Sequence, residues 1–330
     1  MKFSFQALGT TWWIEIFTDL NDTQQAEVKD FCLLFVATYE NNYSRFKSDS
    51  QLSILNRDRV LPNPTPEFIK LLEYGKQLYL RTDTHFNLLT GHILESKGYD
   101  ATYSFKDTQS KETPGNPITD LTISADIIEL HHGNVDLGGF GKGYLIDLLT
   151  DNLRRRFDLR QFLINGGGDM YATQQDGKAV EIYLEHPINH GTVIARTKLH
   201  NQGFAASSPH RRVWQNSTGT HHHIIGDTIT ADGTYIKAAS AADADAFATT
   251  ILQLGKNKIE SLAQYENLAV AHINATTNQL TKTRNFDWLL GKSWIYSTSY
   301  RVVTVTPINS YLLITINRNI VETELIYITQ

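Results

Sequence analysis

The stretch that most constrains the fold runs from Val135 to Asp147, VDLGGFGKGYLID. It joins a short apolar, strand-like entry to a helical pattern that continues to about Phe157. Four glycines lie within six positions of this stretch: Gly138, Gly139, Gly141 and Gly143. A strand, a glycine turn and a helix in this order form an anion site, because glycines let backbone N–H groups approach a phosphate and a helix start carries partial positive charge. Lys142 supplies a counter-charge within the turn.

This turn fits neither of two common phosphate-binding motifs. A P-loop requires Ser or Thr after its Gly-Lys pair and glycine at its first position, but Gly143 and Asp136 stand there. The Rossmann spacing Gly-x-Gly-x-x-Gly fails because Tyr144 or Ile146 occupies its last glycine position. By itself, the turn predicts phosphate or diphosphate binding and a plain strand-to-helix connection about equally well.

The composition is that of a folded, soluble protein. The chain has 330 residues, of which 41% are hydrophobic and 20% charged, so it can bury a sizeable core in one large domain or two. Its formal net charge of −5 gives no reason to expect nucleic acid or an anionic membrane as partner. The single cysteine, Cys32, excludes an internal disulfide and lies in an apolar helical pattern, where we expect it to be buried.

Signals for membrane insertion or export are not expected in this sequence. No run of about 18 apolar residues exists, so we expect no transmembrane segment. The opening residues, MKFSFQALGTTWWIEIF, lack the apolar core of a signal peptide, and no lipid-anchor cysteine lies near them. We therefore expect a cytoplasmic location.

Strand patterns occur along most of the chain. Residues 3–17 alternate like a strand interrupted at Gly9-Thr10, and residues 121–137 alternate like a hairpin that leads into the glycine turn. Further strands are expected within 158–210, 221–240 and 268–283, and again beyond about 290.

Helix signals alternate with these strands. Asp22 with Gln25 resembles a capping box, and Thr65-Pro66-Glu67 is a favourable helix start with proline at the first helical position. Residues 43–56 between them are polar and predict a loop followed by a short turn. Two more helices are expected, over 241–254 and 258–265. Periodicity by itself indicates only mixed helices and strands, and the fold class we expect is α+β.

One of these helices carries a possible metal-binding pair. Asp245 and Thr249 are four residues apart, so their oxygens lie on one helix face and together suit Mg2+. The alternative is a surface aspartate and a buried threonine that bonds back to the helix, and the residues alone favour it. Three alanines permit close approach to another backbone: Ala244, Ala246 and Ala248.

Two further segments carry weaker chemical signals. The run His221-His222-His223 alternates faces if it is a strand, so it can supply one inward histidine as acid, base or ligand but no compact three-histidine metal site. The segment LINGGGDM has three glycines after a strand, which permit close backbone approach to a flat ligand or to another strand.

Taken in order, these segments resemble the ApbE family, the FAD:protein FMN transferases. The likeness covers roughly residues 5–275 and includes a Gly-Gly-Asp loop and an Ala-Asp-Ala-x-x-Thr helix. Each segment alone is a weak indication of the family, but seven segments in the family's order are a strong one. They are ALGTTWWIEI, YSRFKSDSQLSILN, THFNLLTG, VDLGGFGKGYLID, FLINGGGDM, HHHIIGDT and ADADAFATTILQLG.

The resemblance implies a site as well as a family. FAD would lie across the glycine loops, and His223 aligns with the family's proposed base. The implied Mg2+ ligands are the backbone oxygen of Gly141 and the side chains of Asp245 and Thr249. The implied flavin contacts are Leu8, Phe46, His85, Phe86 and Asn87. The implied contacts in the glycine loops are Gly138, Gly139, Lys142, Asn165, Gly166 and Gly167.

The implied reaction moves FMN from FAD to a Ser or Thr hydroxyl of a partner flavoprotein and releases AMP, with Mg2+ and Lys142 neutralising the diphosphate. The implied fold has T-fold-like antiparallel sheets packed with helices, in a catalytic domain over residues 1–290. Residues 291–330 would form a small β-rich extension. The family's acceptor motif is absent, with Asp232-Gly233-Thr234 the nearest segment, so the acceptor is expected to be another protein.

Three departures from the family pattern leave alternatives open. Asn87 replaces an acidic residue, Ala206-Ser207-Ser208 replaces Thr-Ser-Gly, and Gly226-Asp227 replaces Asp-Pro. With water as acceptor, the same site would hydrolyse FAD to FMN and AMP. A third alternative is a flavin-binding protein without catalysis.

Overall fold

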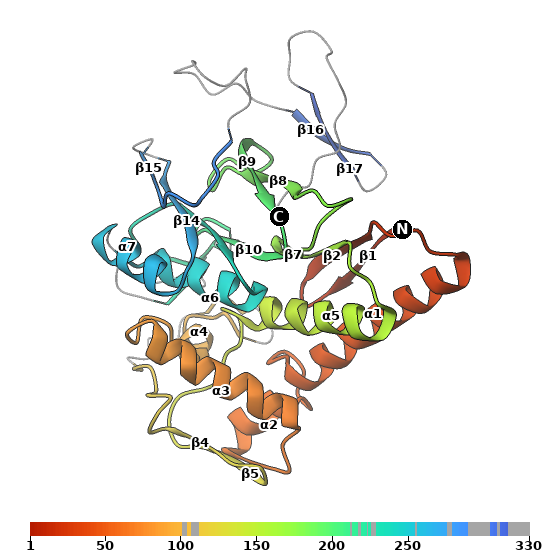
Figure 1. Ribbon diagram of the computed structural model, residues 1–330. Helices are drawn as coiled ribbons and strands as arrows, with labels where there is room; N and C mark the ends of the chain where they lie inside the picture. Colours follow the sequence, from red (N-terminus) through yellow and green to blue (C-terminus); the bar gives the residue numbers. More distant parts are fainter. Residues whose placement is uncertain are drawn as a thin grey trace.

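A computed structural model describes residues 1–100, 104–106, 112–211, 213–216, 219–222, 224–225, 229–254, 256–275, 279–289, 304–308 and 311–315. Within these ranges, no helix combines the length and the apolar character needed to cross a membrane. The centre is an eight-stranded antiparallel sheet (Figure 1). Its strands, in spatial order, are β1 (Lys2–Ala7), β2 (Thr10–Ile16), β6 (Phe162–Gly166), β7 (Asp169–Ala172), β10 (Gln202–Ser207), β13 (Gly233–Ala238), β14 (Ala269–Asn274) and β15 (Gln279–Lys282).

Helices cover one face of this sheet. The helices that pack most closely on its strands are α1 (Asp22–Tyr43), α5 (Gly141–Phe157) and α6 (Ala241–Ile251). A further layer lies beyond them (Figure 1). It contains α2 (Gln51–Asp58), α3 (Pro66–Arg81), α4 (Gly91–Ser96) and a small sheet in the order β3 (Val60–Pro62), β5 (Ile127–Leu130), β4 (Leu121–Ile123). Helix α7 (Lys256–Tyr265) precedes β14.

The other face of the sheet is covered by the hairpin of β8 (Val180–Glu185) and β9 (Val193–Leu199). Alternation along the strands divides the two cores, because successive strand residues point to opposite faces. Ile164 and Ile236 join the core on the helical side, whereas their neighbours Leu163 and Tyr235 join the core beneath the hairpin. Two more hairpins are formed by β11 (Val213–Asn216) with β12 (Gly219–His222) and by β16 (Thr304–Ile308) with β17 (Tyr311–Thr315).

The α+β prediction is confirmed, with local corrections. The capping box of α1 is Asn21 with Gln24, one residue before the predicted pair, because the Asn21 side chain accepts the Gln24 N–H and the Gln24 side chain accepts the Asn21 N–H. Residues 51–58, predicted as loop and turn, form α2, whose N-cap Ser50 accepts the Ser53 N–H. Cys32 is buried, as predicted.

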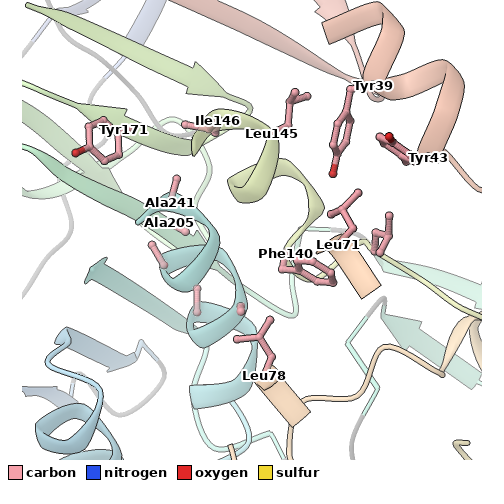
Figure 2. Packing of buried hydrophobic residues seen from close by; sticks show 14 of the residues in the cluster. Tyr39, Tyr43, Leu71, Leu78, Phe140, Leu145, Ile146, Tyr171, Ala205 and Ala241 are labelled. Carbon is pink, nitrogen blue, oxygen red and sulfur yellow. The ribbon is translucent and has the colours of Figure 1, made fainter. Parts of the chain in front are cut away.

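Helix α5 lies between α1 and α6, with Tyr39 on one side and Ala241 on the other (Figure 2). The α5–α6 contact is so close that a Cβ atom at Gly143 would overlap the carbonyl group of Ala241. Glycine is therefore required at position 143 by the packing of two helices, whatever else the turn binds. Close approach was predicted at Ala244, Ala246 and Ala248, whereas the contact with Gly143 is made by Ala241 and Ala242 at the start of the same helix.

We expect Gly143→Ala to lower the free energy of unfolding by about 1–3 kcal/mol, because the added methyl group overpacks the α5–α6 contact. Urea titration followed by circular dichroism measures the change. Asp151→Ala on an exposed face of the same helix is the control and should change it by no more than about 0.5 kcal/mol. Equal stability of the Gly143→Ala protein and the control would contradict the overpacked contact.

Candidate active site

A cavity of about 1440 Å³ opens where the glycine turn, α6 and the ends of several sheet strands meet. Twelve of the residues selected from the sequence line it: Leu8, Phe46, His85, Phe86, Asn87, Gly138, Gly139, Gly141, Lys142, Gly167, Asp245 and Thr249. Asn165 and Gly166 do not line it. His223 lies outside the described residues, although Ile224 and Ile225 after it line the cavity.

Asp245 connects α6 to the start of α5. Its side chain is 6% exposed, and its Oδ2 accepts the Gly143 N–H at 3.1 Å and lies 3.5 Å from the Lys142 Nζ. The carbonyl oxygen of Gly141 accepts a hydrogen bond from the Tyr39 hydroxyl at 3.0 Å. One turn along α6 from Asp245, the Thr249 Oγ1 lies 3.2 Å from the Ser207 Oγ. The first turn of α5 and one face of α6 therefore meet at the cavity wall.

This group of oxygens suits a hard divalent cation. Asp245, Gly141 and Thr249 offer one carboxylate, one carbonyl and one hydroxyl oxygen at the same wall. Within the described part of the chain, no cluster of three His, Cys, Asp or Glu side chains could hold an ion by itself. Mg2+ is commonly bound by one or two carboxylates together with water and substrate phosphates. The residues present fit that mode of binding.

Lys142 is held by a second carboxylate that the sequence analysis did not select. Its ammonium group forms a salt bridge with Asp169, the first residue of β7, whose side chain is 7% exposed. The sequence signal for Asp169 is its position at the end of the LINGGGDM segment. Lys142 thus lies between two buried carboxylates, those of Asp169 and Asp245.

Two of the residues predicted for the site, Asn165 and Gly166, do not line the cavity but support the glycine loop between β6 and β7. The Asn165 Oδ1 accepts the Gly168 N–H at 2.8 Å. A Cβ atom at Gly166 would lie 3.0 Å from the Trp12 ring. Gly167 lines the cavity with a φ of +74°, and a side chain there would overlap Thr10. Only the third of these residues is placed to touch a ligand.

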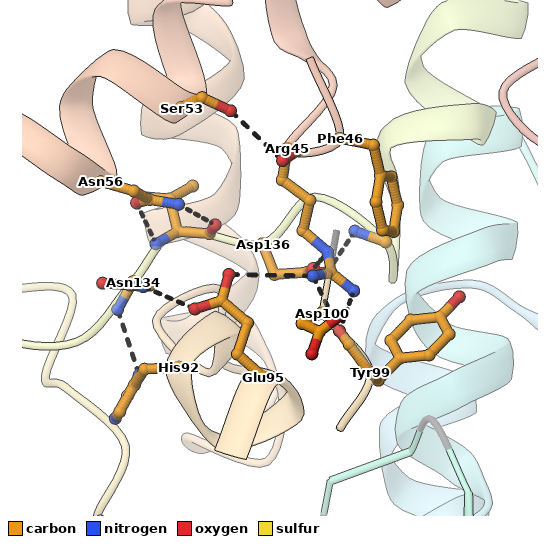
Figure 3. Close-up of polar contacts among 12 residues, drawn as sticks. Arg45, Phe46, Ser53, Asn56, His92, Glu95, Tyr99, Asp100, Asn134 and Asp136 are labelled. Carbon is orange, nitrogen blue, oxygen red and sulfur yellow. Dashed lines mark hydrogen bonds and ion pairs between the residues drawn. The ribbon is translucent and has the colours of Figure 1, made fainter. Parts of the chain in front are cut away.

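Arg45 joins three segments of the cavity wall (Figure 3). Its Nε lies 2.7 Å from the Asp136 Oδ2, and the Asp136 Oδ1 accepts the Gly138 N–H at 2.6 Å. Its two terminal nitrogens donate to the Tyr99 carbonyl oxygen at 3.0 Å, and its guanidinium group lies 4.3 Å from the centre of the Phe46 ring. No local sequence pattern predicts the pair Arg45 and Asp136, because 91 positions of sequence separate two residues that meet only in the fold.

An aromatic wall forms one side of the cavity. Tyr99 and Trp214 stack with ring centroids 5.4 Å apart and planes 16° apart, and Phe46 meets the Tyr99 ring edge-on. The Trp214 indole donates to the Lys97 carbonyl oxygen at 2.8 Å, which fixes the ring. We define the aromatic wall as Phe46, Tyr99 and Trp214. Tyr99 and Trp214 are only 9% and 7% exposed, so most of the ring surface that this wall can offer to a ligand belongs to Phe46, which is 39% exposed.

The segment from His85 to Asn87 is held by its own polar contacts. The Asn87 amide donates to the Gly115 carbonyl oxygen and its oxygen accepts the Leu89 N–H, both at 2.8 Å. The His85 Nε2 lies 3.2 Å from the Lys258 Nζ of α7. Asn87 therefore has a structural role in this loop. Its side-chain oxygen stands where the family has a carboxylate, and it already accepts the Leu89 N–H.

A half-buried carboxylate on α5, that of Asp147, caps the neighbouring helix. The two oxygens of Asp147 accept the N–H groups of Ala241 and Ala242, each at 2.8 Å. Burial between the helices raises the Asp147 pKa to about 7, because loss of water disfavours the charged form. The two backbone donors oppose this rise in pKa without cancelling it.

The fold and the site define a protein of the ApbE type. The model of the ApbE family matches residues 8–273, so the chain belongs to this family. The resemblance predicted from the seven short segments is thereby confirmed.

Named relatives and solved structures agree with this assignment. The "FAD:protein FMN transferase" of Haemophilus influenzae is 23% identical over 84% of this chain and 87% of its own length, and that of Escherichia coli K12 is 22% identical over 80% and 81%. The ApbE protein of Thermotoga maritima matches the fold with a TM-score of 0.75 at 19% identity, over 86% of this chain and 97% of its own. The flavin transferase ApbE of Vibrio cholerae matches with a TM-score of 0.68 at 18% identity, over 89% and 97%.

We expect the Arg45–Asp136 pair to contribute to stability as a coupled unit. Removing one partner, in Arg45→Gln, leaves a carboxylate 10% exposed without its counter-charge and should lower the free energy of unfolding by about 3–5 kcal/mol. Arg45→Gln, Asp136→Asn and the double variant form a cycle measured by urea titration, and we expect a coupling energy of about 0.5–3 kcal/mol.

The control for this cycle is the exposed pair Arg57–Asp58 on α2. Arg57→Gln should change the free energy of unfolding by less than about 1 kcal/mol, because solvent screens that pair. Strictly additive effects of Arg45→Gln and Asp136→Asn would show that the two side chains do not act together.

The raised pKa of Asp147 predicts a pH dependence of stability. The carboxyl pKa is 3.8 in the unfolded chain and about 7 in the folded protein, so between these values the folded state binds more protons than the unfolded state. The Asp147 contribution to the free energy of unfolding should therefore fall as pH rises from about 4 to 7. Asp147→Asn should remove this component, so the difference between its stability curve and that of the wild type isolates the group. Parallel curves would contradict the pKa shift.

Proposed function

We propose that the protein transfers the FMN part of FAD to a Ser or Thr hydroxyl of a partner flavoprotein and releases AMP. The observation that carries the proposal is the meeting of Lys142, Gly141, Asp245 and Thr249 at one cavity in a chain of the ApbE family. The names of the relatives give the substrate class, because a FAD:protein FMN transferase takes FMN from FAD. FAD is therefore the proposed donor, and a flavoprotein the proposed acceptor.

The diphosphate of FAD would lie against the glycine turn and the first turn of α5. The helix start carries partial positive charge, and the Lys142 ammonium group adds a full one. Gly141, through its carbonyl oxygen, and the side chains of Asp245 and Thr249 would hold Mg2+. When bound there, Mg2+ would neutralise charge that develops on the phosphates. Asp169 would orient Lys142 toward the same phosphates.

The transfer exchanges one phosphorus–oxygen bond for another. The acceptor hydroxyl oxygen forms a bond to the FMN phosphorus, and the bond from this phosphorus to the bridging oxygen breaks. AMP leaves with the bridging oxygen, and Lys142 would balance its added negative charge. The hydroxyl proton must pass to a base, for which we propose His223 on the basis of the family resemblance. His223 itself lies outside the described residues.

The ring systems of FAD would use the rest of the cavity. The aromatic wall of Phe46, Tyr99 and Trp214 would supply an apolar surface, most of it from Phe46, and Leu8 and Phe86 line the cavity as well. Stacking on such a surface contributes binding energy without demanding particular polar groups. We propose that this wall, together with the segment His85–Asn87, positions the flavin while the turn and α6 hold the diphosphate.

The proposed activity predicts a covalent product. The full chain with FAD, Mg2+ and an acceptor flavoprotein domain bearing the family's target motif should give a fluorescent flavin band on the acceptor in a denaturing gel. The band should be lost when the acceptor Ser or Thr is changed to Ala, and when Asp245→Asn removes the carboxylate charge. Asp151→Asn, which removes an equal charge from an exposed site on α5, should retain the band.

Omitting the acceptor separates transfer from hydrolysis. AMP that forms only when acceptor is present supports transfer, whereas rapid FMN and AMP formation from FAD alone would identify a FAD pyrophosphatase. Tight FAD binding with no AMP under either condition, and no effect of Asp245→Asn on that binding, would identify a flavin-binding protein without catalysis.

A further inference from the structure

The first turn of α6 has every backbone donor satisfied, and half of the partners come from another helix. The Asp147 carboxylate of α5 accepts the N–H groups of Ala241 and Ala242. Ser240, the N-cap residue, accepts the Asp243 N–H through its hydroxyl at 3.1 Å and the Ala244 N–H through its carbonyl oxygen at 3.2 Å. The last of these is the first bond within the helix itself, whereas helix starts ordinarily leave the other three donors to water or to a local side chain. Here a side chain 94 residues earlier in the sequence takes two of them.

Asp147 lies about one helical turn after Gly143, the second contact between α5 and α6. At this second contact the Gly143 N–H donates to the Asp245 Oδ2 at 3.1 Å, and the backbone of Ala241 packs directly on Gly143. The two contacts fix both the separation of the helices and their register along the axis. Gly141 is on α5, and Asp245 and Thr249 are on α6, so these contacts also fix the relative positions of the three proposed cation ligands.

We propose that Asp147 is a positioning residue for the cation site: by holding the start of α6 against α5, it sets the distance from the Gly141 carbonyl oxygen to Asp245 and Thr249 and so sets the affinity for a divalent cation. This inference rests on the proposed function, because it concerns the same cation. Asp147 acts through the backbone of Ala241 and Ala242, and no direct contact with the cation is involved.

A separate anchor on the other side of α6 makes this role testable apart from folding. Asp243 accepts hydrogen bonds from the Arg81 guanidinium at 2.8 Å and from the Tyr74 hydroxyl at 2.7 Å, and Arg81 also binds Glu266. This network ties α6 to α3 when the Asp147 contacts are lost. Loss of those contacts should therefore let the start of α6 shift without releasing the helix.

The test uses the full chain and Mn2+ as the probe of the cation site. Asp147→Asn replaces one acceptor oxygen by an amide nitrogen, which cannot accept an N–H. Mn2+ binding in the presence of FAD, followed by electron paramagnetic resonance of the free ion, should weaken about 10- to 100-fold, the range found for residues that orient metal ligands. Asp151→Asn, on the same helix and one turn further on, should bind Mn2+ as the wild type does.

A second measurement distinguishes a positioning role from a purely structural one. Saturating Mg2+ should restore most of the FMN transfer rate of Asp147→Asn, so that the change lies in the Mg2+ concentration needed for half-maximal rate. Asp147→Glu, which keeps both oxygens but adds a methylene group, provides the comparison if the asparagine variant does not fold. It should weaken Mn2+ binding in the same direction.

Wild-type Mn2+ affinity in folded Asp147→Asn or Asp147→Glu, with lowered thermal stability only, would overturn the inference, as would a rate that saturating Mg2+ does not restore. Failure of the proposed function would be visible separately, because the wild-type protein would then show neither FMN transfer nor Mn2+ binding. That outcome would overturn the positioning role as well.

Discussion

The site depends on an imbalance of charge among three groups at the junction of α5, α6 and β7. Two buried carboxylates, those of Asp169 and Asp245, flank one ammonium group, that of Lys142. These three groups carry a formal charge of −1, which favours a cation nearby, because burial weakens the screening by water. A divalent cation would reverse the sign to +1, and the reversed sign favours a diphosphate. These three charges therefore suit the joint binding of a divalent cation and an anionic substrate.

That junction exists only because the backbones can approach closely. A side chain at Gly143 would overlap Ala241, and a side chain at Gly203 would overlap Ser240 at the other side of the same helix start. Small residues in both neighbours let α6 pack down between α5 and the sheet, so that Asp245 reaches the first turn of α5. Glycine at position 143 is thus required for packing, and the turn would also allow the proposed approach of a phosphate, so sequence patterns alone could not decide between these two roles.

The parts of the site that the sequence predicted are those carried by short local patterns. The glycine turn, the pair Asp245 and Thr249 on one helix face, and the start of α3 at Thr65 all follow from spacing within a few residues. Leu34, by contrast, fits the apolar pattern of α1 and is 69% exposed, because that helix has apolar residues on several faces and only packing selects the buried one. Asp169, Arg45 and Trp214 act through partners distant in the sequence, and no local spacing encodes such contacts.

The cavity is built from two kinds of structure, and the departures from the family pattern that the structure describes occur in both. Asn87 lies in a loop, whereas Ala206-Ser207-Ser208 lies at the end of β10, where Ser207 contacts Thr249. The diphosphate half consists of helix starts and strand ends, which hold Gly141, Lys142, Asp169 and Asp245 in place from several sides. The half that bears the aromatic wall is assembled from connecting segments and a small hairpin, joined chiefly by Arg45. Loops of this kind tolerate change, whereas a charge pattern at packed helix ends does not. Asn87 belongs to the loop half, and its side chain serves the loop itself. The chemistry proposed for the chain therefore rests on Gly141, Lys142, Asp245 and Thr249 in the diphosphate half, and the orientation of the flavin would be set by the half that bears the aromatic wall.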